Sequence, residues 1–303
     1  MTPLPVARGY LEGEGRVLDL MIQFDTMMAD CFLADYVHLR FSLKKLKRAF
    51  TRWQKGLAKS GWNALYLENH DHPRVIDRYG SRKFWRESGT MLAACILFQR
   101  GTPFIYQGQE LGMTNIKLPS IGEYLDVVSI NAYHRFHLRE PEEKRLHRIH
   151  VSSRDSARTP VQWTPGKNAG FSEHEPWFYV NPNYKEINAE TERKDPYSIL
   201  NFYRKCLRLR KQSAALLWGS YREYARQSRK LYVYERTYGE ERILVICSFS
   251  KQPLRFHLPG AFRGQEAKVI LDNYPKKDRL ENDGAVHWLQ PYEVRVLKAR
   301  FSG

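Results

Sequence analysis

The sequence lacks the features that mark membrane-spanning, secreted and metal-binding proteins. No apolar run reaches the roughly 20 residues that a membrane-spanning helix needs, and the opening residues MTPLP do not form a basic segment followed by an apolar one. Only four cysteines occur among the 303 residues, far apart at positions 31, 95, 206 and 247, and no Cys-x-x-C pair is present. We therefore expect no membrane partner, no secretory signal, no disulfide framework and no metal site. Buried free thiols are typical of a reducing cytoplasm, and nothing in the sequence points to a cofactor.

The basic charge is large but dispersed. The chain has 49 lysines and arginines against 33 acidic residues, a net charge of +16 that raises the question of nucleic-acid binding. The densest basic run, Lys44 to Lys55, also carries apolar residues at helical spacing, which predict a buried stripe: Leu43, Leu46, Phe50, Trp53 and Leu57. The basic residues of this run then fall on the solvated face of an amphipathic helix. We therefore expect no nucleic-acid partner, and a nucleic-acid-binding module is the weakest of the alternatives.

Strand-like and helical patterns alternate in the first two thirds of the chain. Short apolar runs at 17–25, 63–67 and 104–106 have the composition of strands. A helical pattern covers about 82–100, with Ser81 as its expected cap. The first two thirds therefore read as strand–helix repeats.

Two further helix starts and one long connection are visible. Ser42 is placed to cap the basic helix, and the Asp195-Pro196 pair is typical of a helix beginning. Residues 107–194 form a polar and aromatic stretch that is long for a connection within a domain. Such stretches are usually functional.

After about residue 216 the hydrophobic period changes from helical to alternating. Apolar and polar residues alternate in short runs, which predict strands at 231–234, 242–247, 254–258, 267–271 and 294–297. We therefore divide the chain into an α/β part, residues 1–215, and an antiparallel all-β sandwich, residues 216–303.

The segment after the 63–67 run carries the first residues suited to catalysis or binding. Asn69, His70 and Asp71 follow the end of a strand, and in a parallel barrel the carboxyl ends of the strands face the substrate. A neutral imidazole beside a carboxylate there is suited to hold vicinal sugar hydroxyls. His-Asp pairs also cap ordinary loops, so this pattern alone is weak. Arg74, just beyond it, is expected to pair with a carboxylate.

Three motifs in fixed order resemble glycoside hydrolase family 13, the α-amylase superfamily. They are Asn69–Asp71 (NHD), Gly101–Met113 (GTPFIYQGQELGM) and Ser153–Trp163 (SRDSARTPVQW). The third motif is similar to the branch that contains oligo-1,6-glucosidases, α-glucosidases, dextran glucosidases and trehalose-6-phosphate hydrolases. The resemblance begins at about residue 17. It implies the C-terminal part of a (β/α)8 TIM barrel, about three β/α repeats, followed by an all-β sandwich domain.

The resemblance also implies roles for individual residues. Asp71 matches the third acidic residue of the family's active site, which binds sugar hydroxyls and helps to distort the ring. His70 matches its neighbour in the glucose-binding subsite, and Arg158 matches an arginine that anchors the terminal glucose; a structural ion pair is the alternative for Arg158. His72 and Arg74 are further candidate substrate-binding residues. The implied partner is an α-gluco-oligosaccharide or another α-glucoside.

The two carboxylates that break the glycosidic bond are not found in the sequence. Retaining glycosidases need a nucleophile and a general acid about 5–5.5 Å apart, and in this family the nucleophile lies in a Gly-x-Arg-x-Asp motif. No such motif precedes Asn69, and Glu12 and Glu14 lie on the wrong side of the first helix to serve as the acid. We therefore expect the isolated chain to be inactive. An N-terminal barrel fragment is the partner that would supply both groups.

Two departures from the family pattern leave the linkage specificity open. His72 stands where glutamine is usual, and Val128 stands where the branch has an acid two residues after Asp126. Both lie near the subsite for the leaving group, so α-1,6, α-1,4 and trehalose 6-phosphate linkages all remain open. The alternative for the whole chain is a non-catalytic interaction homologue of the superfamily. Retention of Asp71 and Arg158 favours the glucosidase.

Overall fold

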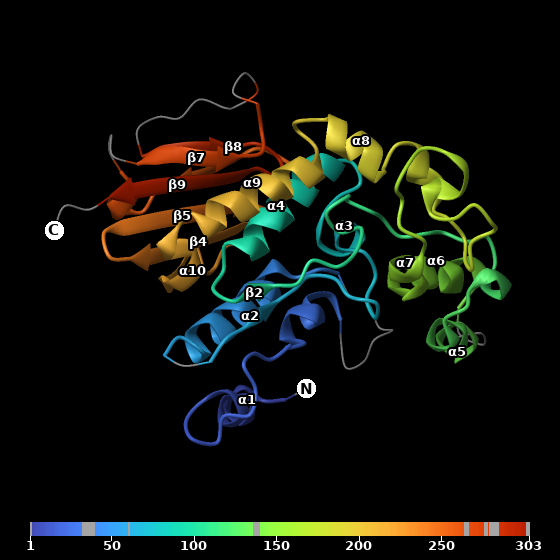
Figure 1. The fold of residues 1–303 in the computed structure, drawn as a ribbon, viewed down its shortest axis with the longest axis horizontal. Coiled ribbons are helices and arrows are strands. Elements are labelled where there is room, and N and C mark those ends of the chain that lie inside the picture. The colour runs from blue at the N-terminus through green and yellow to red at the C-terminus, as the bar shows by residue number, and fades with distance from the viewer. Residues whose placement is uncertain are drawn as a thin grey trace.

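The computed structural model describes residues 2–31, 40–59, 61–135, 140–263, 267–275, 278 and 285–300. Figure 1 shows helices and very short strands from the first two thirds of the chain beside a β-sheet from the last third. Helices α4 (Trp85–Leu97) and α9 (Ile199–Lys211) lie against this sheet and join the two parts.

The remaining helices are short, apart from α2 and α6. In chain order they are α1 (Leu4–Leu11), the 3-10 helix η1 (Asp25–Asp30), α2 (Leu43–Gly56), α3 (Val75–Tyr79), η2 (Ile121–Glu123), α5 (Val127–Arg135), α6 (Glu142–Ser152), α7 (Asp155–Arg158), η3 (Lys167–Gly170), η4 (Pro182–Lys185), α8 (Ala189–Lys194), α10 (Ala214–Trp218) and η5 (Gly260–Phe262). The strands are β1 (Ala64–Leu65), β2 (Thr102–Pro103), β3 (Ser220–Tyr224), β4 (Leu231–Tyr238), β5 (Glu241–Ser248), β6 (Leu254–His257), β7 (Lys268–Asp272), β8 (Val286–Leu289) and β9 (Val294–Arg300).

Three chain segments run parallel and side by side in the first part. β1 pairs in parallel with β2, and Met21 forms a parallel bridge to Asn63. The Phe104 amide donates to the Leu65 carbonyl at 2.7 Å, which extends the pairing beyond β2. The expected strand order is therefore present, but the strand predicted over 17–25 is reduced to the bridge at Met21. The third strand, predicted over 104–106, is instead the two-residue β2 that precedes these positions.

Helix α2 confirms the predicted amphipathic helix, with one exception. The Ser42 hydroxyl accepts a hydrogen bond from the Lys45 amide at 3.4 Å and so caps the helix as expected. The predicted apolar stripe is buried: Leu43, Leu46, Phe50, Trp53 and Leu57. Lys47 is the exception, because it is 1% exposed rather than solvated. Its ammonium reaches backbone carbonyls in the β domain.

Two predicted helix starts are wrong. Ser81 does not cap a helix, since α4 begins only at Trp85. Asp195 closes α8 instead of opening α9, and Ser198 is the cap of α9, where its hydroxyl accepts from the Asn201 amide at 3.1 Å. The Asp195-Pro196 pair therefore forms a turn between two helices.

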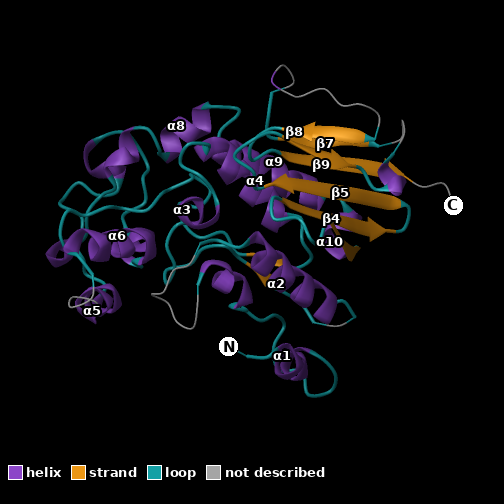
Figure 2. Ribbon diagram, turned by 180° about the vertical axis from the view of Figure 1, so that it is seen from behind, coloured by secondary structure: helices purple, strands orange, loops and turns teal. Residues whose placement is uncertain are grey.

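The last third of the chain forms two sheets. Five strands pair antiparallel in the order β3-β4-β5-β9-β7, and β6 pairs with β8. Apolar side chains of β4, β5 and β9 pack on one face against α4 and α9 and on the other against β6 and β8. Figure 2 shows α4 and α9 alongside the large sheet. The sequence prediction missed β3 and β8. The division at 215/216 stays a prediction, and α10 crosses that position.

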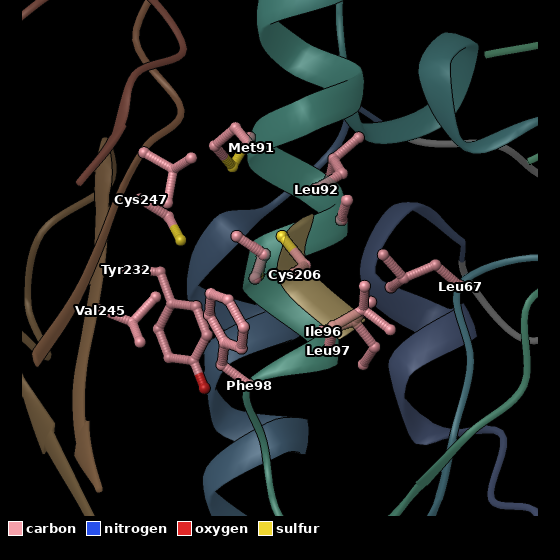
Figure 3. Close-up of a cluster of buried hydrophobic side chains, with 14 of the residues drawn as sticks. Leu67, Met91, Leu92, Ile96, Leu97, Phe98, Cys206, Tyr232, Val245 and Cys247 are labelled. Atoms are coloured by element: carbon pink, nitrogen blue, oxygen red, sulfur yellow. The ribbon is translucent and has the colours of Figure 1, made fainter. Parts of the chain in front are cut away.

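The main core lies where α4 and α9 meet the large sheet. Figure 3 shows Met91 and Cys206 from these helices beside Tyr232 and Cys247 from the sheet. All four cysteines of the chain are free and buried, as predicted. The core therefore contains residues of both parts of the chain.

The long 107–194 connection is folded rather than extended. Helices α5, α6, α7 and α8 lie along it, and a small apolar cluster of its own includes Tyr124, Ile149 and Phe178. Figure 1 shows this part projecting beside α3. It carries Arg158 to the turn that follows β1.

Candidate functional site

The turn after β1 presents two polar side chains to solvent. The Asn69 side-chain oxygen accepts from the Asp71 amide at 2.8 Å, and this local bond shapes the turn. The side chain of His70 is 67% exposed and that of Asp71 is 42% exposed. Because β1 runs parallel to its neighbours, this turn lies at the carboxyl end of the three segments.

Helix α7 brings Arg158 to this turn. The Arg158 Nη2 atom lies 3.0 Å from Asp71 Oδ1, and its Nε donates to the His70 carbonyl at 2.9 Å. His70 Nε2 lies 3.3 Å from Asp71 Oδ2. The structure thus brings together His70, Asp71 and Arg158, which are up to 88 positions apart in the sequence. Their roles toward a sugar remain predictions.

Arg74 lies beneath this site and holds it in place. It is fully buried, and its Nη1 lies 3.0 Å from Glu68 Oε2, so the expected pairing with a carboxylate is present. The same guanidinium donates from Nε to the Ser156 carbonyl at 3.2 Å and from Nη1 to the Gln107 carbonyl at 2.7 Å. Arg74 therefore fixes α7 over the barrel segment. The role of Arg74 as a substrate contact stays a prediction. The complete burial of its side chain does not favour that role.

Sequence reasoning missed Arg154 and gave Asp126 no part in the site. Arg154 Nη1 lies 3.3 Å from Asp71 Oδ1, and its Nη2 lies 2.6 Å from Asp126 Oδ1. Asp71 is thus held by two arginines, one of which links it to a buried second carboxylate. Arg154 lies in the same motif as Arg158, four residues earlier, and that helical spacing was the available signal.

Neither of the two acids beside Asp71 is suited to donate a proton. Burial opposes the ionisation of Asp126, but hydrogen bonds from Arg154 and Ser129 outweigh it and hold the pKa of Asp126 below its usual value. Burial raises the pKa of Glu68, with the Arg74 charge opposing the shift. Glu68, however, is 2% exposed and bound to Arg74, so a substrate does not reach it.

The remaining predicted residues lie around this site or away from it. His72 is partly exposed, with its ring centroid 6.3 Å from that of the exposed Phe24. Glu12 follows α1 and pairs with Arg8 at 2.9 Å. Figure 1 shows α1 beyond α2, well away from α7. Glu12 is therefore not part of the Asp71 site.

No metal or membrane feature appears in the described part of the chain. Among the described residues, no group of three or more histidines, cysteines and acids is arranged to hold a metal ion. None of the described helices is long and apolar enough to cross a membrane.

The arrangement is suited to bind a polyol and not to cleave it. A carboxylate, an imidazole and two guanidinium groups offer acceptors and donors to neighbouring hydroxyls. Glycosidic cleavage also needs a nucleophile and a proton donor on opposite sides of the bond. Asp71 supplies one carboxylate, and its neighbours Asp126 and Glu68 are already bound by arginines.

Comparison with known protein families places both parts of the chain. Residues 4–219 match the model described as "Alpha amylase, catalytic domain", and residues 222–296 match "Maltogenic Amylase, C-terminal domain". Among curated proteins, the oligo-1,6-glucosidase of Halalkalibacterium halodurans is 40% identical over 297 residues, covering 97% of this chain and 52% of that protein. The trehalose-6-phosphate hydrolase of Bacillus subtilis is 38% identical, covering 95% and 52%.

Solved structures give the same result. The trehalose-6-phosphate hydrolase of Bacillus licheniformis superposes with a TM-score of 0.93 at 37% identity, covering 99% of this chain and 55% of that one. The isomaltulose synthase of Klebsiella superposes with a TM-score of 0.91 at 33% identity, covering 98% and 54%. The predicted fold class, a partial barrel followed by a β domain, is confirmed. The chain spans about half the length of the curated relatives that it matches.

Proposed function

The chain belongs to the α-amylase family of glycoside hydrolases, and we propose that it is the glucose-binding part of an α-glucosidase-type enzyme. The substrate would be an α-linked gluco-oligosaccharide or another α-glucoside used in carbohydrate metabolism. The contact of Asp71 with Arg158 and His70 carries the proposal, because these groups match family residues that grip one glucose. His72 borders the same site and would face the leaving group.

The isolated chain would not hydrolyse its substrate. Asp71 orients hydroxyls, but bond cleavage needs a separate nucleophile and acid. In this proposal both carboxylates lie outside the 303 residues. The chain alone would bind glucose with a Kd above millimolar, because half of the pocket wall is missing. The binding free energy would then be less favourable than about −4 kcal/mol.

Exposed apolar side chains support a partner with the rest of the barrel. Val17 is 70% exposed and Ile22 is 49% exposed along the first parallel segment. Phe104 is 44% exposed just beyond β2. The first segment and β2 lie on opposite sides of β1, so these apolar groups stand at both edges of the parallel segments, where they favour association. The partner would be a fragment that carries the first barrel strands and both missing carboxylates, and we expect poor solubility without it.

The cysteines support a cytoplasmic location. All four are free and buried, although the protein has enough of them for two bridges. Free thiols of this kind are typical of a reducing compartment.

Turnover by the purified chain tests the proposal. We expect no hydrolysis above background of p-nitrophenyl α-glucoside, isomaltose or trehalose 6-phosphate, and activity when a fragment with the first five barrel strands is co-expressed. In the complemented enzyme, Asp71→Asn should abolish this activity. Turnover by the chain alone, lost in Asp71→Asn, would show that an acid within these residues had been overlooked. Absence of activity in the complemented complex would favour the non-catalytic interaction homologue.

A further inference from the structure

A basic hollow lies between α2 and the turn that joins β3 to β4. It has a volume of about 760 Å³, and no residue of the Asp71 site lines it. Six of its lining residues are basic: Lys44, Lys47, Arg48, Arg52, Lys55 and Arg226. The single acid is Glu223, so the lining carries five more positive than negative charges. The hollow is therefore a strongly positive concavity.

Lys47 fixes one wall of the hollow to the other. Its ammonium donates to the carbonyls of Ala225 at 2.8 Å, Ser228 at 3.0 Å and Leu231 at 3.0 Å. Ala225 has a φ of 49°, a left-handed conformation that an alanine adopts at a cost in free energy. The buried lysine holds this turn against α2. The opposing cations are thus pre-positioned instead of being brought together by a ligand.

Several cations in the hollow are available to a ligand. Arg48, Lys55 and Arg226 are exposed, and within the described residues none of the three has an ion-pair partner. Arg52 is paired with Asp25 at 3.1 Å, and Lys44 donates to a glutamine at 3.3 Å. The basic residues of α2 extend along about 16 Å of helix, at about 1.5 Å per residue. The free charge therefore suits an elongated anion.

Glu223 is the one acid in the lining of the hollow. Its Oε2 accepts from the Thr51 hydroxyl at 2.7 Å, whereas its Oε1 is buried and has no hydrogen-bond partner. Because this oxygen is closed to solvent, it is not a contact for a ligand in the hollow. The negative charge of Glu223 opposes an anion, and the six basic residues of the lining outweigh it.

We infer that this hollow binds a short chain of phosphate groups. All nine lining residues are polar or charged and none is aromatic, so the hollow has no ring on which a base or a sugar face could stack. Single-stranded nucleic acids are normally held by aromatic stacking as well as by charge. A flat bilayer does not enter a concavity. Arginine side chains form short, charge-assisted hydrogen bonds to phosphate oxygens. An oligophosphate is the anion with the charge density that fits.

Titration calorimetry with tripolyphosphate at pH 6.5 tests this inference. The sample is the 303-residue chain, with its complementing fragment where solubility requires it. We expect one site, with affinity that falls as salt rises. Arg48→Gln combined with Arg226→Gln should weaken binding about tenfold or more, because two charge-assisted contacts are lost. Both side chains are exposed, so folding is retained.

A matched control carries Lys45→Gln and Arg222→Gln. Lys45 lies on the same helix as Arg48, and Arg222 lies on β3, which leads into the turn that carries Arg226. Both are exposed and do not line the hollow, and the control has the same net charge as the test variant. We expect it to bind tripolyphosphate as the unmodified chain does. Equal weakening in both variants, or no binding at all, would overturn the inference, because the attraction would then be non-specific or absent.

Other anions complete the experiment. Sulfate, which carries less charge than tripolyphosphate, should bind more weakly, and Glu223→Gln should strengthen the binding of both anions because it removes a repelling charge. An oligothymidylate or a polyglutamate peptide that binds more tightly than tripolyphosphate, and loses affinity in the Arg48→Gln/Arg226→Gln variant, would instead assign the hollow to that polymer. The inference does not depend on the proposed glucosidase function, and its test uses no hydrolytic activity.

Discussion

At the scale of single residues, Arg74 positions the candidate site. Its side chain is inaccessible to solvent, and it donates hydrogen bonds to the Glu68 carboxylate and to the Ser156 carbonyl. These two acceptors are more than 80 positions apart in the sequence. The partly exposed Asp71 and Arg158 meet because this guanidinium fixes the segment that carries Arg158. A charge in that position is stable only while its partner is present.

Substitution Arg74→Met should therefore destabilise the chain strongly. It leaves the Glu68 carboxylate buried without its cation, which typically costs about 3–5 kcal/mol. Urea unfolding followed by tryptophan fluorescence measures the loss. The double variant Arg74→Met/Glu68→Gln should recover part of the free energy of unfolding. A loss below about 1 kcal/mol in the single variant would contradict a positioning role.

Glu192 gives a residue-scale prediction of pH dependence. Burial raises its pKa to about 7, and the Leu200 amide bonded to its carboxylate at 3.1 Å opposes that shift. The folded state thus keeps a proton that the unfolded state loses near its ordinary value of 4.5. Its contribution to stability is complete below that value and is lost as the pH rises through about 7.

Glu192→Gln should remove this dependence. Unfolding in urea at several pH values between 5 and 8 should show the variant gaining stability relative to the unmodified chain as the pH rises. Glu190→Gln is the matched control, because Glu190 lies two residues earlier on the same helix and is exposed. This variant should leave the pH dependence of stability unchanged. A constant difference between Glu192→Gln and the unmodified chain across this range would contradict the shifted pKa.

At the scale of elements, β8 and β9 share a buried charged group. Arg295 Nη1 lies 3.1 Å from His287 Nδ1, and Arg295 also pairs with Glu293 at 2.6 Å. Burial, and then the Arg295 charge, lower the pKa of His287 to about 4. The His287 imidazole therefore stays neutral in the folded protein and takes up a proton more readily in the unfolded chain.

Acid should lower the stability of the folded chain through His287. The folded pKa of His287 is below the unfolded value of 6.5, so its contribution to stability is complete above 6.5 and is lost as the pH falls toward 4. Thermal melts between pH 7 and 4 should show a smaller acid-induced fall in Tm for His287→Asn. His257→Asn, an exposed histidine on β6, should keep the full fall. Identical profiles for both variants would contradict the prediction.

At the scale of the whole molecule, the two parts of the chain share a core. Tyr234 of β4 donates to the Cys95 carbonyl of α4 at 3.0 Å, and Arg236 donates to the Phe98 carbonyl at 2.7 Å. The same apolar cluster contains residues of η1, α2, α4, α9 and the large sheet (Figure 3). Removal of either part would expose this apolar surface.

The molecule should therefore unfold as one unit. Differential scanning calorimetry should give a single transition, with equal calorimetric and van't Hoff enthalpies. Val245→Ala, in the shared core, should lower the transition temperature without splitting the peak, since a buried apolar truncation costs about 1–3 kcal/mol. Two resolved transitions would show that the parts are independent domains.

The sequence by itself determined the family, the strand–helix order and the change to β structure. These follow from local patterns: ordered motifs at 69–71, 101–113 and 153–163, and hydrophobic periods that read the same in any context. The buried stripe of α2 was predicted residue by residue for this reason. Helix ends were less certain, since Ser198 and Asp195 are both good caps and only their neighbours decide between them.

The tertiary structure alone decided which charges are buried and what they hold. In the sequence Lys47 looks like a solvated cation and Arg74 like a substrate contact, and each is buried because a distant segment supplies its partners. The link from Asp71 through Arg154 to Asp126 likewise depends on how the 107–194 connection folds back. A charge leaves water only when several groups surround it at once, and the sequence does not record which groups will meet.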